Sequence, residues 1–131
     1  KTHIDVDQNL VIQVEVRLIE QALSNLYQNA LRYATEGTTI TLSAHRLPNR
    51  QIELRVKDEG PGISSEHQKR LFERFYRVDR ARSREMGGTG LGLAIVKHIA
   101  LHHGGEANVS SEVGSGSVFR ILLPERSSLS I

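Results

Sequence analysis

The sequence predicts an α/β fold in which pairs of strands alternate with about three helices. Short stretches rich in β-branched residues alternate between apolar and polar side chains, as is typical of half-buried strands. Longer proline-free segments repeat apolar residues three and four positions apart, as is typical of amphipathic helices. The 131 residues show no internal repeat, so we expect one domain over residues 1–125 and a flexible serine-rich tail at 126–131.

The first half of the chain predicts a hairpin, a long helix and a second pair of strands. We expect the hairpin at residues 3–6 and 10–14, and the helix at about 15–34. The strand pair is expected at 38–47 and 51–56, on either side of a turn with proline. One arc of the helix is apolar and is expected to face the core: Ile19, Ala22, Leu23, Leu26 and Ala30.

The second half predicts two helices and a closing hairpin. A short helix is expected from about Ser64 to Phe72, where serine precedes an acidic residue as at a helix start. Periodicity is lost over 73–86, which predicts a long loop. A helix is then expected at about 91–103, stopped by two glycines. The hairpin is expected at 106–111 and 117–123.

Composition excludes several classes of function. There is no cysteine, which rules out disulfides, thiolate metal sites and thiol nucleophiles. A net charge of +2 is too small to predict nucleic-acid binding. No apolar run approaches the roughly 18 residues of a membrane span. Because the chain begins with Lys1, we expect it to be part of a longer protein, which could be anchored in a membrane elsewhere.

A glycine-rich stretch from Gly87 to Leu93 opens the helix expected at 91–103. Glycines let backbone N–H groups approach a ligand closely, and the first turn of a helix offers unpaired donors. This combination predicts an anion site, best suited to a polyphosphate. Its G-x-G-x-G spacing differs from the dinucleotide fingerprint, and no Walker lysine follows.

The helix expected at 15–34 also carries a polar stripe, formed by Asn25, Asn29 and Arg32. Asparagine is a mediocre helix former, so two of them beside a cation suggest that the stripe makes contacts. Asp58 follows a strand directly, in the tight loop Asp58-Glu59-Gly60-Pro61-Gly62. Its carboxylate can accept a hydrogen bond from an exocyclic amine.

In this order, these motifs closely resemble those of the catalytic and ATP-binding domain of sensor histidine kinases, in the Bergerat-fold superfamily. Residues 25–33 resemble the N box, 58–62 the first glycine box, 71–77 the F box, 88–93 the second glycine box, and 114–116 a small third glycine motif. The resemblance spans nearly the whole chain. It implies a two-layer sandwich, with a mixed and mostly antiparallel sheet against about three helices and a long ATP lid.

The resemblance also implies ATP and Mg²⁺ as cofactors. In the family, the residue matching Asn29 binds Mg²⁺, the one matching Arg32 contacts phosphate, and the one matching Asp58 reads the adenine amino group. The residues implied in catalysis are Asn25, Asn29 and Arg32. The residues implied in nucleotide binding are Asn29, Arg32, Tyr33, Asp58, Gly60, Gly62, Ile63, Phe75, Tyr76, Arg77, Gly88, Thr89, Gly90, Leu91, Gly92 and Leu93.

The expected lid contributes cations and anchors. We expect one or two of its arginines to touch nucleotide, from the set Arg77, Arg80, Arg82 and Arg84. Phe72 and Phe75 are expected to anchor the lid hinges in the core or against a partner helix. His102 and His103 are adjacent on a helix and point about 100° apart, so they are expected to serve the helix end rather than bind a metal.

The resemblance implies phosphoryl transfer rather than hydrolysis. Where ATP-hydrolysing branches of the superfamily carry a glutamate that activates water, this chain has Asn25, and an amide cannot act as a general base. No histidine here is followed by Glu or Asp, so the phosphoacceptor histidine is expected on a separate dimerisation domain. Expected partners are that domain and a response regulator, with no nucleic acid. The domain is expected in the cytoplasm, and its parent is expected to be a homodimer in the bacterial inner membrane.

Two alternatives remain at this point. One is a Bergerat-fold ATPase or an anti-sigma-type serine kinase. Asn25 argues against the ATPase, and the long F-box segment argues against the serine kinase. The other is a nucleotide-binding regulatory domain without catalysis.

Overall fold

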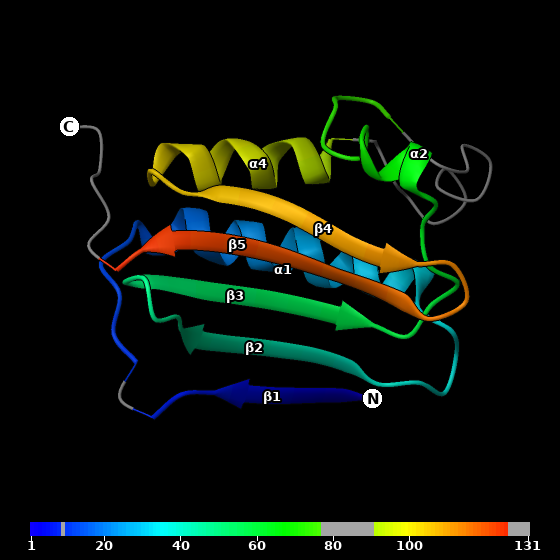
Figure 1. Ribbon diagram of the computed structural model, residues 1–131, viewed down its shortest axis with the longest axis horizontal. Helices are drawn as coiled ribbons and strands as arrows, with labels where there is room; N and C mark the ends of the chain where they lie inside the picture. The colour runs from blue at the N-terminus through cyan, green and yellow to red at the C-terminus, as the bar shows by residue number, and fades with distance from the viewer. Residues whose placement is uncertain (9, 77–90, 126–131) are drawn as a thin grey trace.

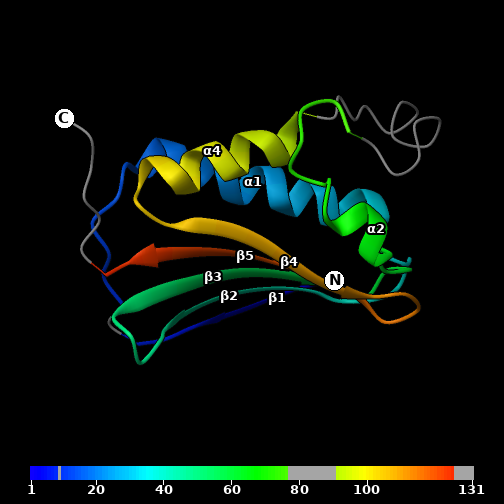
Figure 2. The same cartoon turned by 45° about the horizontal axis from the view of Figure 1, so that its top comes forward.

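A computed structural model describes residues 1–8, 10–76 and 91–125, and the statements below concern these ranges. The strands are β1 (Thr2–Val6), β2 (Ile40–Arg46), β3 (Gln51–Asp58), β4 (Glu106–Glu112) and β5 (Gly116–Pro124), and the helices are α1 (Val16–Tyr33), α2 (Ser65–Gln68) and α4 (Gly92–His102). The strands form one sheet in the order β1-β2-β3-β5-β4 (Figure 1). Figure 2 shows the helices together on one face of this sheet. The predicted two-layer sandwich is confirmed.

Sheet pairing is antiparallel except at one edge, where β1 runs parallel to β2. The predicted strand pairs β2–β3 and β4–β5 are therefore confirmed. No helix in the described ranges is long and apolar enough to cross a bilayer.

The core lies between the sheet and the helices. Alternate residues of the two central strands are buried there: Ile52, Leu54 and Val56 of β3, and Phe119, Ile121 and Leu123 of β5. The predicted arc of α1 supplies the opposite side, with Ile19, Ala22, Leu26 and Ala30 buried and Leu23 half-buried. Burial of each large apolar side chain contributes about 1.5–3 kcal/mol, so this interface is the main force that holds α1 on the sheet.

The predicted hairpin at residues 3–6 and 10–14 is wrong. β1 pairs with β2, in a register that runs from Thr2 opposite Ile40 to Val6 opposite Ala44. The stretch 10–14 belongs to the crossover that parallel pairing requires, which continues through α1. Its alternation places the half-buried side chains of Leu10, Ile12 and Val14 against the core, a pattern that looks the same in sequence as a paired strand.

The helix predicted to reach Phe72 is also shorter than expected, because α2 ends at Gln68. The chain then continues in turns that bring Leu71 and Phe72 onto the core. Ser64 occupies the N-cap position of α2, yet its side chain makes no capping hydrogen bond to the described residues. The backbone oxygen of Ser64 instead accepts from the Gln68 N–H at 3.0 Å.

The two adjacent histidines serve helix ends, as predicted. His103 is fully buried at the end of α4, where its Nδ1 lies 2.9 Å from the Ile99 oxygen and its Nε2 accepts the Glu15 N–H at 3.1 Å. These partners assign the proton to Nδ1. His102 Nε2 lies 3.2 Å from the Glu15 carboxylate. The C-terminal end of α4 is thereby joined to the N-terminal end of α1.

Candidate functional site

The polar stripe predicted on α1 lies along its flank toward α4, and Asn25, Asn29 and Arg32 are all half-buried there. Asn25 donates from Nδ2 to the Gly92 oxygen, at 3.2 Å. In contrast, the side chains of Asn29 and Arg32 make no hydrogen bond or ion pair with the described residues. The stripe therefore holds one engaged amide, followed by an amide and a cation that are available to a ligand.

Asp58 ends β3 and is buried, with 4% of its surface exposed. One carboxylate oxygen accepts the Gly60 N–H at 2.9 Å. Burial raises the pKa of the Asp58 carboxyl, because a charged group is poorly solvated there, while backbone N–H groups of Gly60 and Ser117 act in the opposite direction. No cation of the described residues forms an ion pair with it. The carboxyl therefore keeps acceptor capacity that no cation of the described residues uses.

The loop after β3 packs against the end of α1. A Cβ atom on Gly60 would lie 2.5 Å from the backbone oxygen of Tyr33 and 3.0 Å from the Asp58 carboxylate. Glycine is therefore required at position 60 by the chain's own packing, in addition to any room needed by a base. This contact brings together Tyr33, Asp58 and Gly60, which the sequence predicted as parts of one site.

The third glycine motif supports the first glycine box. Gly114 donates its N–H to the Pro61 oxygen at 2.7 Å. Gly62 has φ +79°, and a Cβ there would lie 2.1 Å from the Glu112 oxygen, so the β4–β5 turn and the loop fit together only with glycine at this position. These contacts place the two motifs side by side in the fold.

Two polar residues that position this loop were not predicted from the sequence. Ser111 Oγ accepts the Ile63 N–H at 2.7 Å and donates to the Gly116 oxygen at 2.8 Å. Gln68 Nε2 donates to the oxygens of Ile63 and Ser111, at 2.7 and 3.0 Å. Neither residue stands in a motif, and Ser111 lies far from Ile63 in sequence, so the pattern of residues carried no signal for them.

The F box divides into three environments. Phe72 packs edge-on against Phe119 of the core, with ring centroids 6.4 Å apart, which confirms its predicted anchoring role. Phe75 is 64% exposed and does not enter the core. Tyr76 hydrogen-bonds through its hydroxyl to His67, and the Arg70 guanidinium lies 4.4 Å from its ring centroid. The predicted nucleotide contacts of Phe75 and Tyr76 remain predictions.

The second glycine box is described from Leu91 onward. Leu91 occupies the N-cap position of α4, Gly92 is the first helical residue, and no side chain among the described residues caps this end. The first-turn N–H groups are thus in the arrangement that favours an anion. The predicted contacts Arg77, Gly88, Thr89 and Gly90, and the lid arginines Arg80, Arg82 and Arg84, lie outside the described residues.

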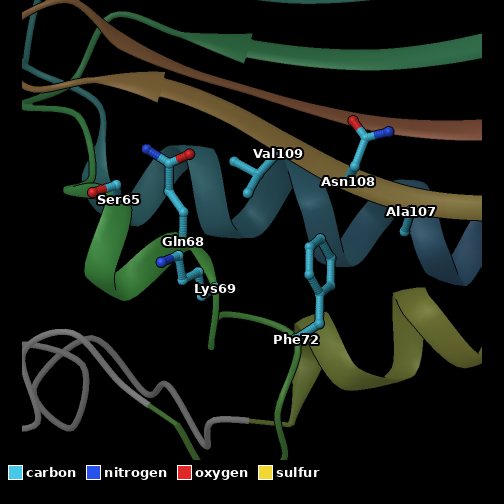
Figure 3. A pocket seen from close by; sticks show the side chains of 7 residues that line it. All are labelled: Ser65, Gln68, Lys69, Phe72, Ala107, Asn108 and Val109. Carbon is cyan, nitrogen blue, oxygen red and sulfur yellow. The ribbon is translucent and has the colours of Figure 1, made fainter.

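A groove of about 370 Å³ lies elsewhere, between α2 and β4 (Figure 3). Its lining residues are Ser65, Gln68, Lys69, Phe72, Ala107, Asn108 and Val109. None of these belongs to the predicted nucleotide contacts, so the groove is a separate feature of the surface.

Histidine kinases are among the solved structures with this fold. The mycobacterial sensor histidine kinase MprB matches with a TM-score of 0.80 and 29% identity, over 97% of this chain and 83% of that one. The catalytic domain of the histidine kinase ThkA matches with a TM-score of 0.81 and 26% identity, over 95% of this chain and 78% of that one.

Residues 14–127 match the family model described as histidine kinase-, DNA gyrase B-, and HSP90-like ATPase, and the chain belongs to this family. The sensor-like histidine kinase SenX3 of Mycolicibacterium smegmatis is 49% identical over 108 residues, which are 82% of this chain and 28% of that protein. The sensor histidine kinase WalK of Bacillus subtilis is 43% identical over 121 residues, which are 90% of this chain and 20% of that protein. The chain thus spans less than a third of the length of these relatives.

Proposed function

We propose that this chain binds Mg²⁺-ATP beside α1 and donates the γ-phosphoryl group to a histidine on a separate dimerisation domain of a longer sensor kinase. The observation that carries the proposal is the buried Asp58 carboxyl. This carboxyl has no cation partner among the described residues. The loop that follows it contacts the backbone oxygen of Tyr33 at the end of α1, the helix that carries Asn29. Membership of an ATPase family that includes histidine kinases supports the same function.

Each side chain has a role that its chemistry permits. Asp58 accepts a hydrogen bond from the adenine amino group, with Tyr33 beside the base. Asn29 offers an amide oxygen, a ligand suited to Mg²⁺, and Arg32 offers a guanidinium suited to phosphate. When bound, Mg²⁺ would offset the negative charge of the phosphates. The first turn of α4, which no side chain of the described residues caps, adds backbone donors at Gly92 and Leu93.

Transfer is favoured over hydrolysis by the chemistry of α1. Asn25 has no basic atom that could activate water, and its amide nitrogen already donates to Gly92. The transferred group therefore needs a nucleophile from another domain. We propose that this domain belongs to the same parent, a homodimer in the bacterial inner membrane with this domain on the cytoplasmic side, and that a response regulator accepts the phosphoryl group next. The names of the relatives as sensor histidine kinases support a place for this chain within a longer sensor kinase.

Mg²⁺-dependent binding of a fluorescent ATP analogue tests the proposal. The wild-type chain is expected to bind the analogue more tightly with Mg²⁺ than with EDTA, and Asn29→Ala is expected to remove this difference. Gln28→Ala, at an exposed position of the same helix, is the matched control and should bind as the wild type. An absence of nucleotide binding would contradict the proposed function.

A further inference from the structure

Two helices frame the proposed nucleotide site, and polar contacts hold them together at two levels. Near the site, Asn25 of α1 donates to the Gly92 oxygen of α4 at 3.2 Å. At the far end of the pair, His103 after α4 accepts the N–H of Glu15, the N-cap of α1. Figure 2 shows α1 and α4 side by side along this length. The Asn25 contact is the one that lies at the glycine-rich start of α4.

The chemistry of this contact selects an amide. The Gly92 carbonyl oxygen can only accept a hydrogen bond, so its partner must donate. The Asn25 amide has N–H groups to donate, whereas the carboxylate of Asp or Glu accepts only and would place negative charge against a carbonyl oxygen. The two positions are neighbours in space, because a Cβ at Gly92 would lie 4.0 Å from the Asn25 Cβ, an ordinary van der Waals separation. Position 25 is thus suited to joining two helices.

The next amide on the same flank is in a different state. Asn29 lies one turn further along α1 and makes no hydrogen bond with the described residues, so its oxygen is available. Asn25 and Asn29 have the same chemistry and similar half-burial, yet one is bound to a neighbouring helix. The Asn25 amide nitrogen therefore joins α1 to α4, a link that Asn29 does not make among the described residues.

We propose that Asn25 is a positioning residue, which sets the first turn of α4 against the Asn29 and Arg32 flank of α1 and acts on nucleotide binding through that turn. The proposal rests on the proposed function, because it takes this turn as the donor of N–H groups to phosphate. Loss of the contact lets the start of α4 move relative to α1. Phosphate binding then weakens, whereas adenosine recognition at Asp58 stays intact, since Asp58 is held by the loop after β3.

The test compares Asn25→Asp with Gln28→Asp, which adds the same charge at an exposed position of the same helix. Affinities for adenosine and for ADP are measured in EDTA, so that no metal contributes, and ATP affinity is measured with Mg²⁺. We expect Asn25→Asp to weaken ADP and ATP binding about tenfold, as for one lost hydrogen bond of about 1.4 kcal/mol, and to leave adenosine affinity unchanged. Asn25→Ser has a side chain too short to reach the Gly92 oxygen and adds no charge. It should also weaken ADP and ATP binding while the chain remains folded.

Three results would overturn the inference: a loss of affinity only in the presence of Mg²⁺, an equal loss for adenosine and ADP, or an equal effect of Gln28→Asp. Hydrogen exchange separates this inference from the proposed function. If the wild type binds neither ADP nor ATP, the proposed function fails. Even then, the backbone amides at the start of α4 should exchange hydrogen faster in Asn25→Asp than in Gln28→Asp, because the hydrogen bond from Asn25 to α4 is lost. Equal exchange rates in the two variants would contradict a role of this hydrogen bond in holding α4 against α1.

Discussion

Asp58→Asn should change which base the chain prefers. In the wild type, one carboxylate oxygen of Asp58 is held by the Gly60 N–H at 2.9 Å, and the proposed function assigns the rest of the group to the adenine amine. Asparagine keeps an oxygen for Gly60 but presents an NH₂ group to the base. Two donors then face each other in the ATP complex. In ITP the same position carries a carbonyl oxygen, which accepts the hydrogen bond that asparagine offers.

The size of the effect follows from the burial of the site. A hydrogen bond to a charged group contributes about 1.5–3 kcal/mol, which corresponds to about 10- to 150-fold in the dissociation constant. We therefore expect the wild type to prefer ATP over ITP by a factor in this range and Asp58→Asn to reverse the preference. The assay is displacement of a fluorescent nucleotide by ATP and by ITP. Equal affinities in the wild type, or an ATP preference that survives in the variant, would refute the assignment of Asp58 to the amine.

The same variant should alter the pH dependence of stability without ligand. Burial raises the pKa of Asp58 in the folded state above its ordinary value, so the folded state binds the proton more tightly than the unfolded state. The stabilisation from this proton is complete below the unfolded pKa and is lost as pH rises through the folded pKa. The stability of Asp58→Asn relative to the wild type should therefore increase over this rise in pH, as measured by thermal melting. A constant difference would contradict the raised pKa.

Two further predictions concern the supports of the site and the edge of the sheet. Gly62→Ala should lower the free energy of unfolding in urea by at least about 3 kcal/mol, because its Cβ would lie 2.1 Å from the Glu112 backbone oxygen. The control Gly114→Ala, with φ +89° and open space around its Cβ, should lower it by only about 1–2 kcal/mol. Similar losses in the two variants would contradict the packing. The hydrogen bond to Asp7 raises the pKa of His45 in the folded state, so the stabilisation from its proton is complete below the ordinary pKa of the unfolded state and is lost as pH rises through the folded pKa. Melting curves of His45→Gln should lack this loss, and an unchanged pH profile would argue against it.

Local sequence patterns predicted most of the fold, because the relevant physics is local. The apolar arc of α1 follows from the helical repeat, and alternation identified β2, β3, β4 and β5. Alternation does not reveal whether a stretch pairs with another strand, which is why the prediction of a hairpin strand at residues 10–14 is wrong. The helix α2 ends earlier than the sequence predicts. The turns after Gln68 are fixed by the tertiary contact of Phe72 with Phe119, which local sequence does not reveal.

The candidate site shows the same division between local and distant information. Motif order predicted Asp58 and Asn29 as parts of one site, and the contact of Gly60 with Tyr33 brings their elements together. The partners that fix the site are distant in sequence. Ser111 of β4 accepts the N–H of Ile63 in the loop after β3, and such single hydroxyl contacts leave no periodic or compositional signal. The link from Asn25 to α4 is hidden for the same reason.

Transfer of phosphate from labelled ATP tests the central claim most directly. The chain is incubated with Mg²⁺ and ATP labelled at the γ-phosphoryl group, alone and with a separate dimerisation domain that carries the phosphoacceptor histidine of a sensor kinase of this type. The account predicts acid-labile phosphohistidine on the added domain, none on this chain, and slow release of free phosphate. Rapid release of phosphate with an unlabelled acceptor, or a stable phosphohistidine on this chain alone, would contradict it.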